Sequence, residues 1–163
     1  MSLKRCKRSL NTSSKEIQYA LASRLNRLLN KLHDEFELNC GGCCFAAYCV
    51  AKLLEEDDFK YSLIVFDSEY DLKQYSELSE LPDVMEHYGL VLDYDDVTNT
   101  ETINCEEDDF DLYYQTFNVT SKDILDCYLN NEWNSCYQTT NNTFVQSLIE
   151  RIYYEFTSSF REG

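Results

Sequence analysis

The residues best suited to chemistry are cysteines gathered in one short stretch of the chain. Four of the eight cysteines fall within residues 40–49, and a glycine pair, Gly41 and Gly42, separates Cys40 from Cys43 ahead of an apolar run. A cysteine in the first turn of a helix meets unpaired amides and the positive end of the helix dipole, which stabilise a thiolate. The glycines leave space and free amides for an oxyanion, so this stretch predicts a cysteine nucleophile.

A cysteine nucleophile needs a base, and the chain has only two histidines. His33 lies off the apolar stripe of a predicted helix, whereas His87 opens a predicted strand whose backbone can aim the ring. A third residue should accept a hydrogen bond from the second ring nitrogen, and Asn104 and Asp93 are the candidates. Asn104 stands at the end of the next predicted strand, which favours the chain order Cys, His, Asn.

The segment Cys40–Ala46 resembles the papain signature C-G-S/A-C-W/Y, and this alignment makes Cys43 the nucleophile. It departs from the signature at Cys44, where an aromatic residue is expected and Phe45 comes one place later. His87 follows Cys43 by 44 residues, a much shorter spacing than the roughly 130–150 of papain itself.

This compact spacing is similar to that of NlpC-type and amidase-type members of the papain-like fold. Those proteins carry D-C-S-G before a helix, a strand H-V-G-I, and then a hydrophobic and a polar residue on the next strand. Asn39–Gly42, His87–Leu90 and Ile103-Asn104 resemble these three pieces in order, and this alignment makes Cys40 the nucleophile instead. Small papain-like proteins of tailed bacteriophages also look similar.

The resemblance covers about residues 38–105 and implies a papain-like α+β fold with cysteine hydrolase activity on a peptide or amide bond. It implies no cofactor and no metal. The thiolate would attack the carbonyl, and the histidine would take and return the proton. The implied site residues are the catalytic Cys43, His87 and Asn104, the alternative nucleophile Cys40, and the oxyanion turn of Gly41, Gly42 and Cys44.

Other interpretations of the same residues remain open. Cys44 and Cys49 are also typical of small buried hydrophobes, and His87 of a structural strand histidine. The chain could then be a non-enzymatic structural or interaction protein on a degenerate papain-like fold, such as a virion or assembly subunit. Cys40 and Cys43 also form a C-x-x-C pair, but a long helix rather than a strand precedes them. A structural zinc site lacks a second C-x-x-C pair.

Periodicity predicts the elements that would position these residues. A capping box, Ser13 with Glu16, starts a helix that keeps apolar residues at i, i+3, i+4 spacing. A small antiparallel sheet follows two N-terminal helices and precedes C-terminal helices, which is the order of an α+β fold. The predicted helices are 14–36, 43–56, a short one near 70–80, 121–130 and 142–160; the predicted strands are 61–66, 87–92, 101–104 and 112–119.

Length and charge limit the remaining possibilities. The 163 residues fit one domain, 1–163, with a flexible basic arm at about 1–12. The net charge of −16 is uneven, because residues 1–31 carry +7 and the other 132 residues carry −23. Nucleic acid is therefore an unexpected partner except through the arm.

No signal peptide or membrane-length apolar run is present, so we expect a soluble, cytoplasmic or virion-associated protein. A protein partner could bind the arm or the aromatic C-terminal residues Trp133, Tyr137, Tyr153, Tyr154 and Phe156.

Overall fold

The computed structural model describes residues 14–36, 42–56, 58–82, 85–93, 100–105, 113–130, 150–151 and 154. Within these residues the fold is mixed α and β, with three long helices and a four-stranded antiparallel sheet, which agrees with the predicted α+β class. The elements are α2 (Ser14–Phe36), α3 (Cys43–Glu56), β1 (Tyr61–Asp67), the 3₁₀ turns η1 (Leu72–Gln74) and η2 (Leu78–Glu80), β2 (His87–Asp93), β3 (Thr100–Ile103), β4 (Tyr113–Phe117) and α4 (Ser121–Asn130).

The predicted element bounds agree closely with these, with one difference in the segment after β1. The short helix expected near residues 70–80 is instead two 3₁₀ turns, η1 and η2. Asp71 caps the first by accepting a bond from the Lys73 amide, and Glu77 and Glu80 cap the second reciprocally. The basic arm, Cys40, Gly41 and the capping residue Ser13 lie outside the described residues, as does most of the predicted helix 142–160.

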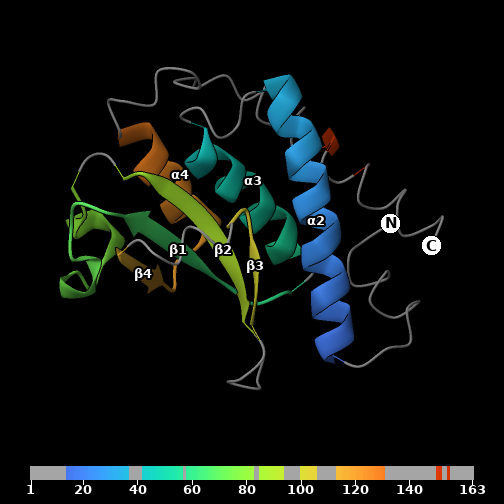
Figure 1. Ribbon diagram of the computed structural model, residues 1–163, viewed down its shortest axis with the longest axis horizontal. Coiled ribbons are helices and arrows are strands. Elements are labelled where there is room, and N and C mark those ends of the chain that lie inside the picture. The colour runs from blue at the N-terminus through green and yellow to red at the C-terminus, as the bar shows by residue number, and fades with distance from the viewer. Residues whose placement is uncertain are drawn as a thin grey trace.

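The sheet has the strand order β3-β2-β1-β4, and its register decides which residues share a face (Figure 1). Directly paired residues of an antiparallel sheet point to the same side, and successive residues alternate. One face therefore carries an apolar set that packs in the core, namely Leu63, Val65, Tyr88, Leu90, Ile103 and Phe117. We call this the helix-side face, and the opposite one the outer face.

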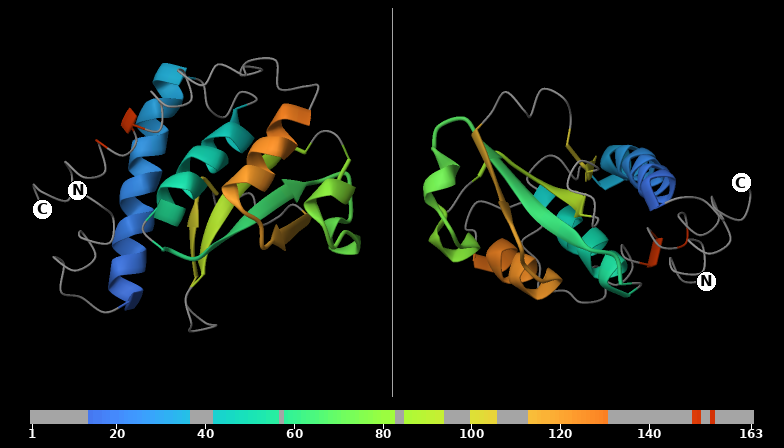
Figure 2. Two further views of the ribbon diagram at one scale, coloured as in Figure 1. Left: turned by 180° about the vertical axis from the view of Figure 1, so that it is seen from behind. Right: turned by 90° about the horizontal axis from the view of Figure 1, so that it is seen from below.

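The helices cover the helix-side face, and α3 is the most enclosed of them (Figure 2). It packs against α4 and β2, while α2 packs along β3 at the edge of the sheet. Its residues Cys43–Ala51 are all buried, so this helix is apolar around its circumference, as expected for a central helix. No helix in the described part of the chain is long and apolar enough to cross a membrane.

The end of α3 is set by a residue in the left-handed conformation. Asp58 has φ of 60°, its amide donates to the Glu55 carbonyl, and the Phe59 amide donates to the Leu54 carbonyl. These two bonds form a Schellman motif, in which Phe59 also packs back into the core with Leu54. The predicted end of this helix at residue 56 is therefore confirmed, and the backbone motif is its structural cause.

Candidate functional site

The first turn of α3 is closed by packing against α4. The Ala46 amide donates to the Gly42 carbonyl at 2.9 Å, which starts the helix, and Gly42 is buried. Cys43 is 8% exposed and Cys44 is 2% exposed. The Cys44 thiol donates to the Ile124 carbonyl of α4 at 3.8 Å. The described part of the predicted oxyanion turn thus lies inside the core rather than on an open surface.

A cluster of sulfur and phenol groups lies where α3, α4 and β2 meet. The Tyr88 hydroxyl is 3.8 Å from the Cys127 Sγ of α4, and the Cys44 thiol lies near enough to that sulfur to shift its pKa. Cys43 is close enough for its charge to act on both Cys44 and Tyr88. We call Cys43, Cys44, Tyr88 and Cys127 the thiol cluster. Cys127 is the member that is partly exposed, while the other three are buried.

Within the thiol cluster, the pKa values of Cys44 and Cys127 are shifted in opposite directions. Hydrogen bonds, first from Cys44 and then from Tyr88, lower the pKa of Cys127 to about 7, although burial opposes this shift. The bond to Cys127, together with burial, raises the pKa of Cys44 well above its ordinary value. Burial is the main reason that the pKa of Tyr88 is also raised, so its hydroxyl stays a donor. Of Cys44 and Cys127, it is therefore Cys127 that has thiolate character near neutral pH.

His87 and Asn104 do lie together, as the sequence predicts, but they meet through the main chain. The His87 Nε2 hydrogen-bonds the Asn104 carbonyl oxygen, and a carbonyl can only accept, so Nε2 carries the proton. The Asn104 side chain is used elsewhere, because its Nδ2 donates to the Tyr88 carbonyl at 3.4 Å. Asn104 has φ of 62°, a conformation that Asn tolerates better than most residues. The His87 ring is therefore held by the backbone of Asn104 rather than by its side chain.

The sheet register separates His87 from the cysteines of α3. His87 pairs with Phe66 of β1, whereas the next residue, Tyr88, pairs with Val65 and reaches the thiol cluster. Alternation along β2 therefore directs the His87 side chain to the outer face, opposite to α3. Direct proton transfer between Cys43 and His87 stays a prediction, and this register does not support it. The alternative nucleophile Cys40 lies outside the described residues.

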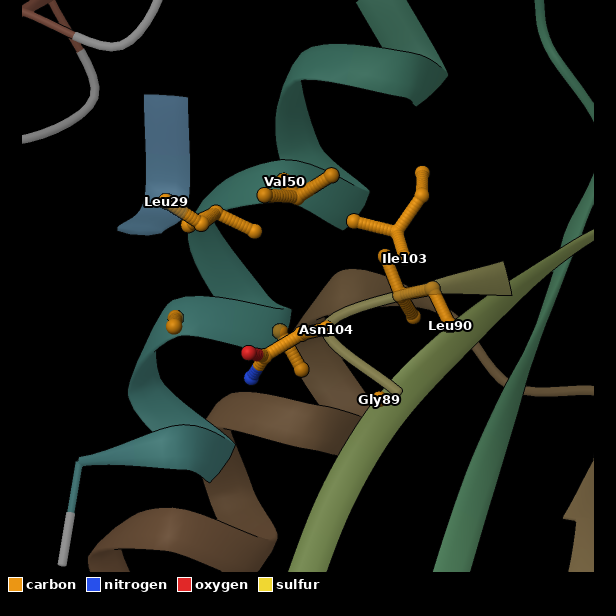
Figure 3. A pocket seen from close by; sticks show the side chains of 8 residues that line it. Leu29, Val50, Gly89, Leu90, Ile103 and Asn104 are labelled. Atoms are coloured by element: carbon orange, nitrogen blue, oxygen red, sulfur yellow. The ribbon is translucent and has the colours of Figure 1, made fainter. Parts of the chain in front are cut away.

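A small crevice lies between α3 and the end of β3, and Asn104 reaches into it (Figure 3). Its walls include Ala46, Val50, Gly89 and Ile103. The space is too narrow to admit a water molecule, so it is a packing defect rather than a substrate pocket.

Two residues of the thiol cluster were not singled out for chemistry by the sequence pattern. Cys127 belongs to the i, i+3, i+4 set with Ile124 and Tyr128, which predicts an inward helix face. Tyr88 follows His87 on the strand and falls on the opposite face by alternation. The sequence pattern thus indicates that Cys127 and Tyr88 both point inward. Whether they meet Cys44 depends on how α4 crosses α3.

Comparison with known proteins adds no relative. No family model, no curated protein and no solved structure matches the chain. In the part of the chain that the structure describes, no group of three or more His, Cys, Asp or Glu side chains is placed to hold a metal ion.

Proposed function

We propose that this chain is a non-catalytic interaction or assembly subunit built on an α+β domain whose element order is papain-like. The observation that carries the proposal is the position of His87 in an aromatic row on the outer face. The His87 and Phe66 rings lie 6.0 Å apart, and Phe66 and Tyr114 lie 6.1 Å apart on the other side. The row runs across β2, β1 and β4, and Phe66 at its centre is fully buried.

This environment gives His87 a structural task. Tilted rings at these separations add to the stability of cross-strand pairs, and the ring also holds the Asn104 carbonyl. The Lys73 ammonium lies 4.1 Å from the Tyr114 ring centre and extends the row by a cation–π contact. A histidine used in this way supports the interpretation of His87 as a strand histidine rather than a base for the α3 thiols.

The interaction role rests on the distribution of charge and aromatic residues. The segment 1–31 carries +7 while the rest of the chain carries −23, so a second copy of the chain itself offers an acidic partner for the basic segment. Tyr154, the one member of the C-terminal aromatic set that is described, is 68% exposed. Exposed aromatic side chains are typical of protein contacts.

One experiment on His87 separates the two functions. Iodoacetamide labelling of Cys43 and Cys44 is measured by mass spectrometry across pH 5.5–8.5 in the wild type, His87→Ala and the control His33→Ala. We expect slow labelling that His87→Ala leaves unchanged, together with a loss of about 1–3 kcal/mol in the free energy of unfolding. The assembly role is checked by sedimentation, where raising the salt or removing residues 1–12 should lower the mass of any oligomer.

Cysteine hydrolase activity is the second candidate, and the tautomer of His87 is the observation that favours it. Because Nε2 donates to Asn104, the lone pair is on Nδ1, which is the atom that could act as a base. Fast labelling of one cysteine among residues 40, 43 and 44 at pH 6, slowed at least tenfold by His87→Ala, would establish this candidate. Covalent capture of the same cysteine by a peptidyl epoxide would identify it as the nucleophile.

A further inference from the structure

We propose that Cys127 and Cys44 form a peroxide-reactive thiol pair, in which a hydroperoxide oxidises Cys127 and Cys44 then closes a disulfide that joins α4 to α3. The proposal goes beyond the assembly role and does not depend on it. It also differs from the C-x-x-C pair of Cys40 and Cys43, because it uses two helices that are distant in sequence.

The geometry assigns different tasks to the two cysteines. Cys127 is partly exposed, so a small oxidant can reach it, whereas Cys44 is buried and 2% exposed. The Cys44 thiol donates at 3.8 Å to the Ile124 carbonyl, one turn before Cys127 on α4, and it lies close enough to lower the pKa of Cys127. The resolving thiol therefore lies against α4, one turn from the reacting cysteine, before oxidation begins.

The chemistry balances in two steps. The Cys127 thiolate attacks the terminal oxygen of a hydroperoxide, the O–O bond breaks, and the products are the Cys127 sulfenic acid and an alkoxide or hydroxide. The leaving oxygen is protonated by solvent. The Cys44 sulfur, losing its proton, then attacks the Cys127 sulfur, an S–S bond forms, and water leaves. Two sulfur-bound electrons have passed to the peroxide oxygen.

The surroundings support the first step. A pKa of about 7 leaves a large share of Cys127 as the nucleophilic thiolate at neutral pH. The Tyr88 hydroxyl, 3.8 Å away, is a donor to that sulfur and can stabilise its negative charge. Cys49 provides the contrast on the same helix as Cys44, because it is fully buried and burial raises its pKa far above the ordinary value.

The test uses the full chain, reduced and then exposed to hydrogen peroxide at pH 7. Remaining thiols are blocked with N-ethylmaleimide, and peptides are mapped by mass spectrometry without reduction. We expect a Cys44–Cys127 cross-link with the loss of two hydrogens. Cys44→Ala should instead yield a Cys127 sulfenic acid that dimedone traps, formed more slowly because Cys44 no longer lowers the pKa of Cys127. Cys127→Ala should remove both products. Cys49→Ala is the matched control and should still form the cross-link.

A further variant probes the thiolate itself. Tyr88→Phe removes the donor, and a rise of about one unit in the pKa of Cys127 would lower its thiolate fraction at pH 7 about fivefold, with the same drop in oxidation rate. The pH profile of oxidation should shift to higher pH while the rate at pH 7 falls, which a purely structural effect would not produce. Oxidation that spares Cys127 in the folded wild type, or that joins Cys127 to a cysteine other than Cys44, would overturn the proposal.

Discussion

The Asn26 side chain of α2 binds the backbone of Asn104 in the way that a neighbouring strand would. Its Oδ1 accepts from the Asn104 amide at 2.7 Å, and its Nδ2 donates to the Thr102 carbonyl at 2.9 Å. β3 pairs with β2 on one side only, so these backbone groups lie at the edge of the sheet. One carboxamide thus satisfies a donor and an acceptor that an edge strand would leave unpaired, and it holds the residue whose carbonyl binds His87.

Asn26→Ala should lower the free energy of unfolding by about 2 kcal/mol, because two part-buried backbone groups lose their partner. Urea unfolding monitored by circular dichroism measures the change. Asn30→Ala is the matched control, since Asn30 is exposed on the same helix, and it should change stability by less than about 0.5 kcal/mol. Equal effects of the two variants would show that the edge bonds add no net stability.

Gly89→Ala should destabilise the sheet by about 2–3 kcal/mol through overcrowding. A Cβ at this position would overlap the Cys105 sulfur and lie 2.9 Å from the Ile103 carbonyl oxygen. Adding Cys105→Ala should recover part of the loss but not all of it, because the Ile103 carbonyl belongs to the backbone. Thermal unfolding of both variants, with Cys105→Ala alone as the control, gives the answer; an unchanged melting temperature for Gly89→Ala would contradict the close approach.

Asp58→Gly should stabilise the protein by about 0.5–1 kcal/mol. Asp58 occupies the left-handed position after α3, where glycine has no steric penalty, and its negative charge opposes the helix dipole. Asp58→Asn keeps the side-chain size and removes only the charge, so the difference between the two variants separates backbone strain from electrostatics. A loss of stability in both would mean that another contact of Asp58 outweighs these terms.

Stability should fall as the pH rises above about 9. Burial raises the pKa values of Cys49, Tyr61 and Tyr88 above their ordinary values in the folded protein. A raised pKa contributes stability below the unfolded pKa, and this contribution is lost as the pH rises toward the folded pKa. For Cys49, whose ordinary pKa is 9.0, the loss is about 1.4 kcal/mol per pH unit above that value.

The contribution of Cys49 can be isolated with Cys49→Ala. Urea unfolding under reducing conditions at about pH 8 and pH 10 should show a smaller drop in stability for this variant than for the wild type. The expected difference between the two drops is about 1.4 kcal/mol, which follows from one pH unit above the ordinary thiol pKa. Equal losses of stability in the wild type and in Cys49→Ala would mean that Cys49 ionises freely in the folded state.

Local patterns were sufficient to predict most elements of the fold. The i, i+3, i+4 spacing in residues 14–36 and the apolar run after Gly42 correspond to α2 and α3, and the short apolar segments correspond to the four strands. These patterns act over one or two turns of chain, where propensity and burial agree. The two 3₁₀ turns were missed because η1 and η2 are held by Asp71 and by the Glu77–Glu80 pair rather than by helical periodicity.

The sequence by itself determined which residues have side chains capable of nucleophilic or acid–base chemistry, and the tertiary structure decided which of them meet. The sequence predicts that His87 and Tyr88 point to opposite sides of their strand. Which of these two side chains points toward α3 depends on the sheet register and on the side that the helices cover. That choice puts Tyr88 rather than His87 beside the cysteines. Cys44 and Cys127 are far apart in the chain, and they come close only because α4 packs across the start of α3. There burial raises the pKa of both thiols, and the interaction between them raises that of Cys44 further while it lowers that of Cys127.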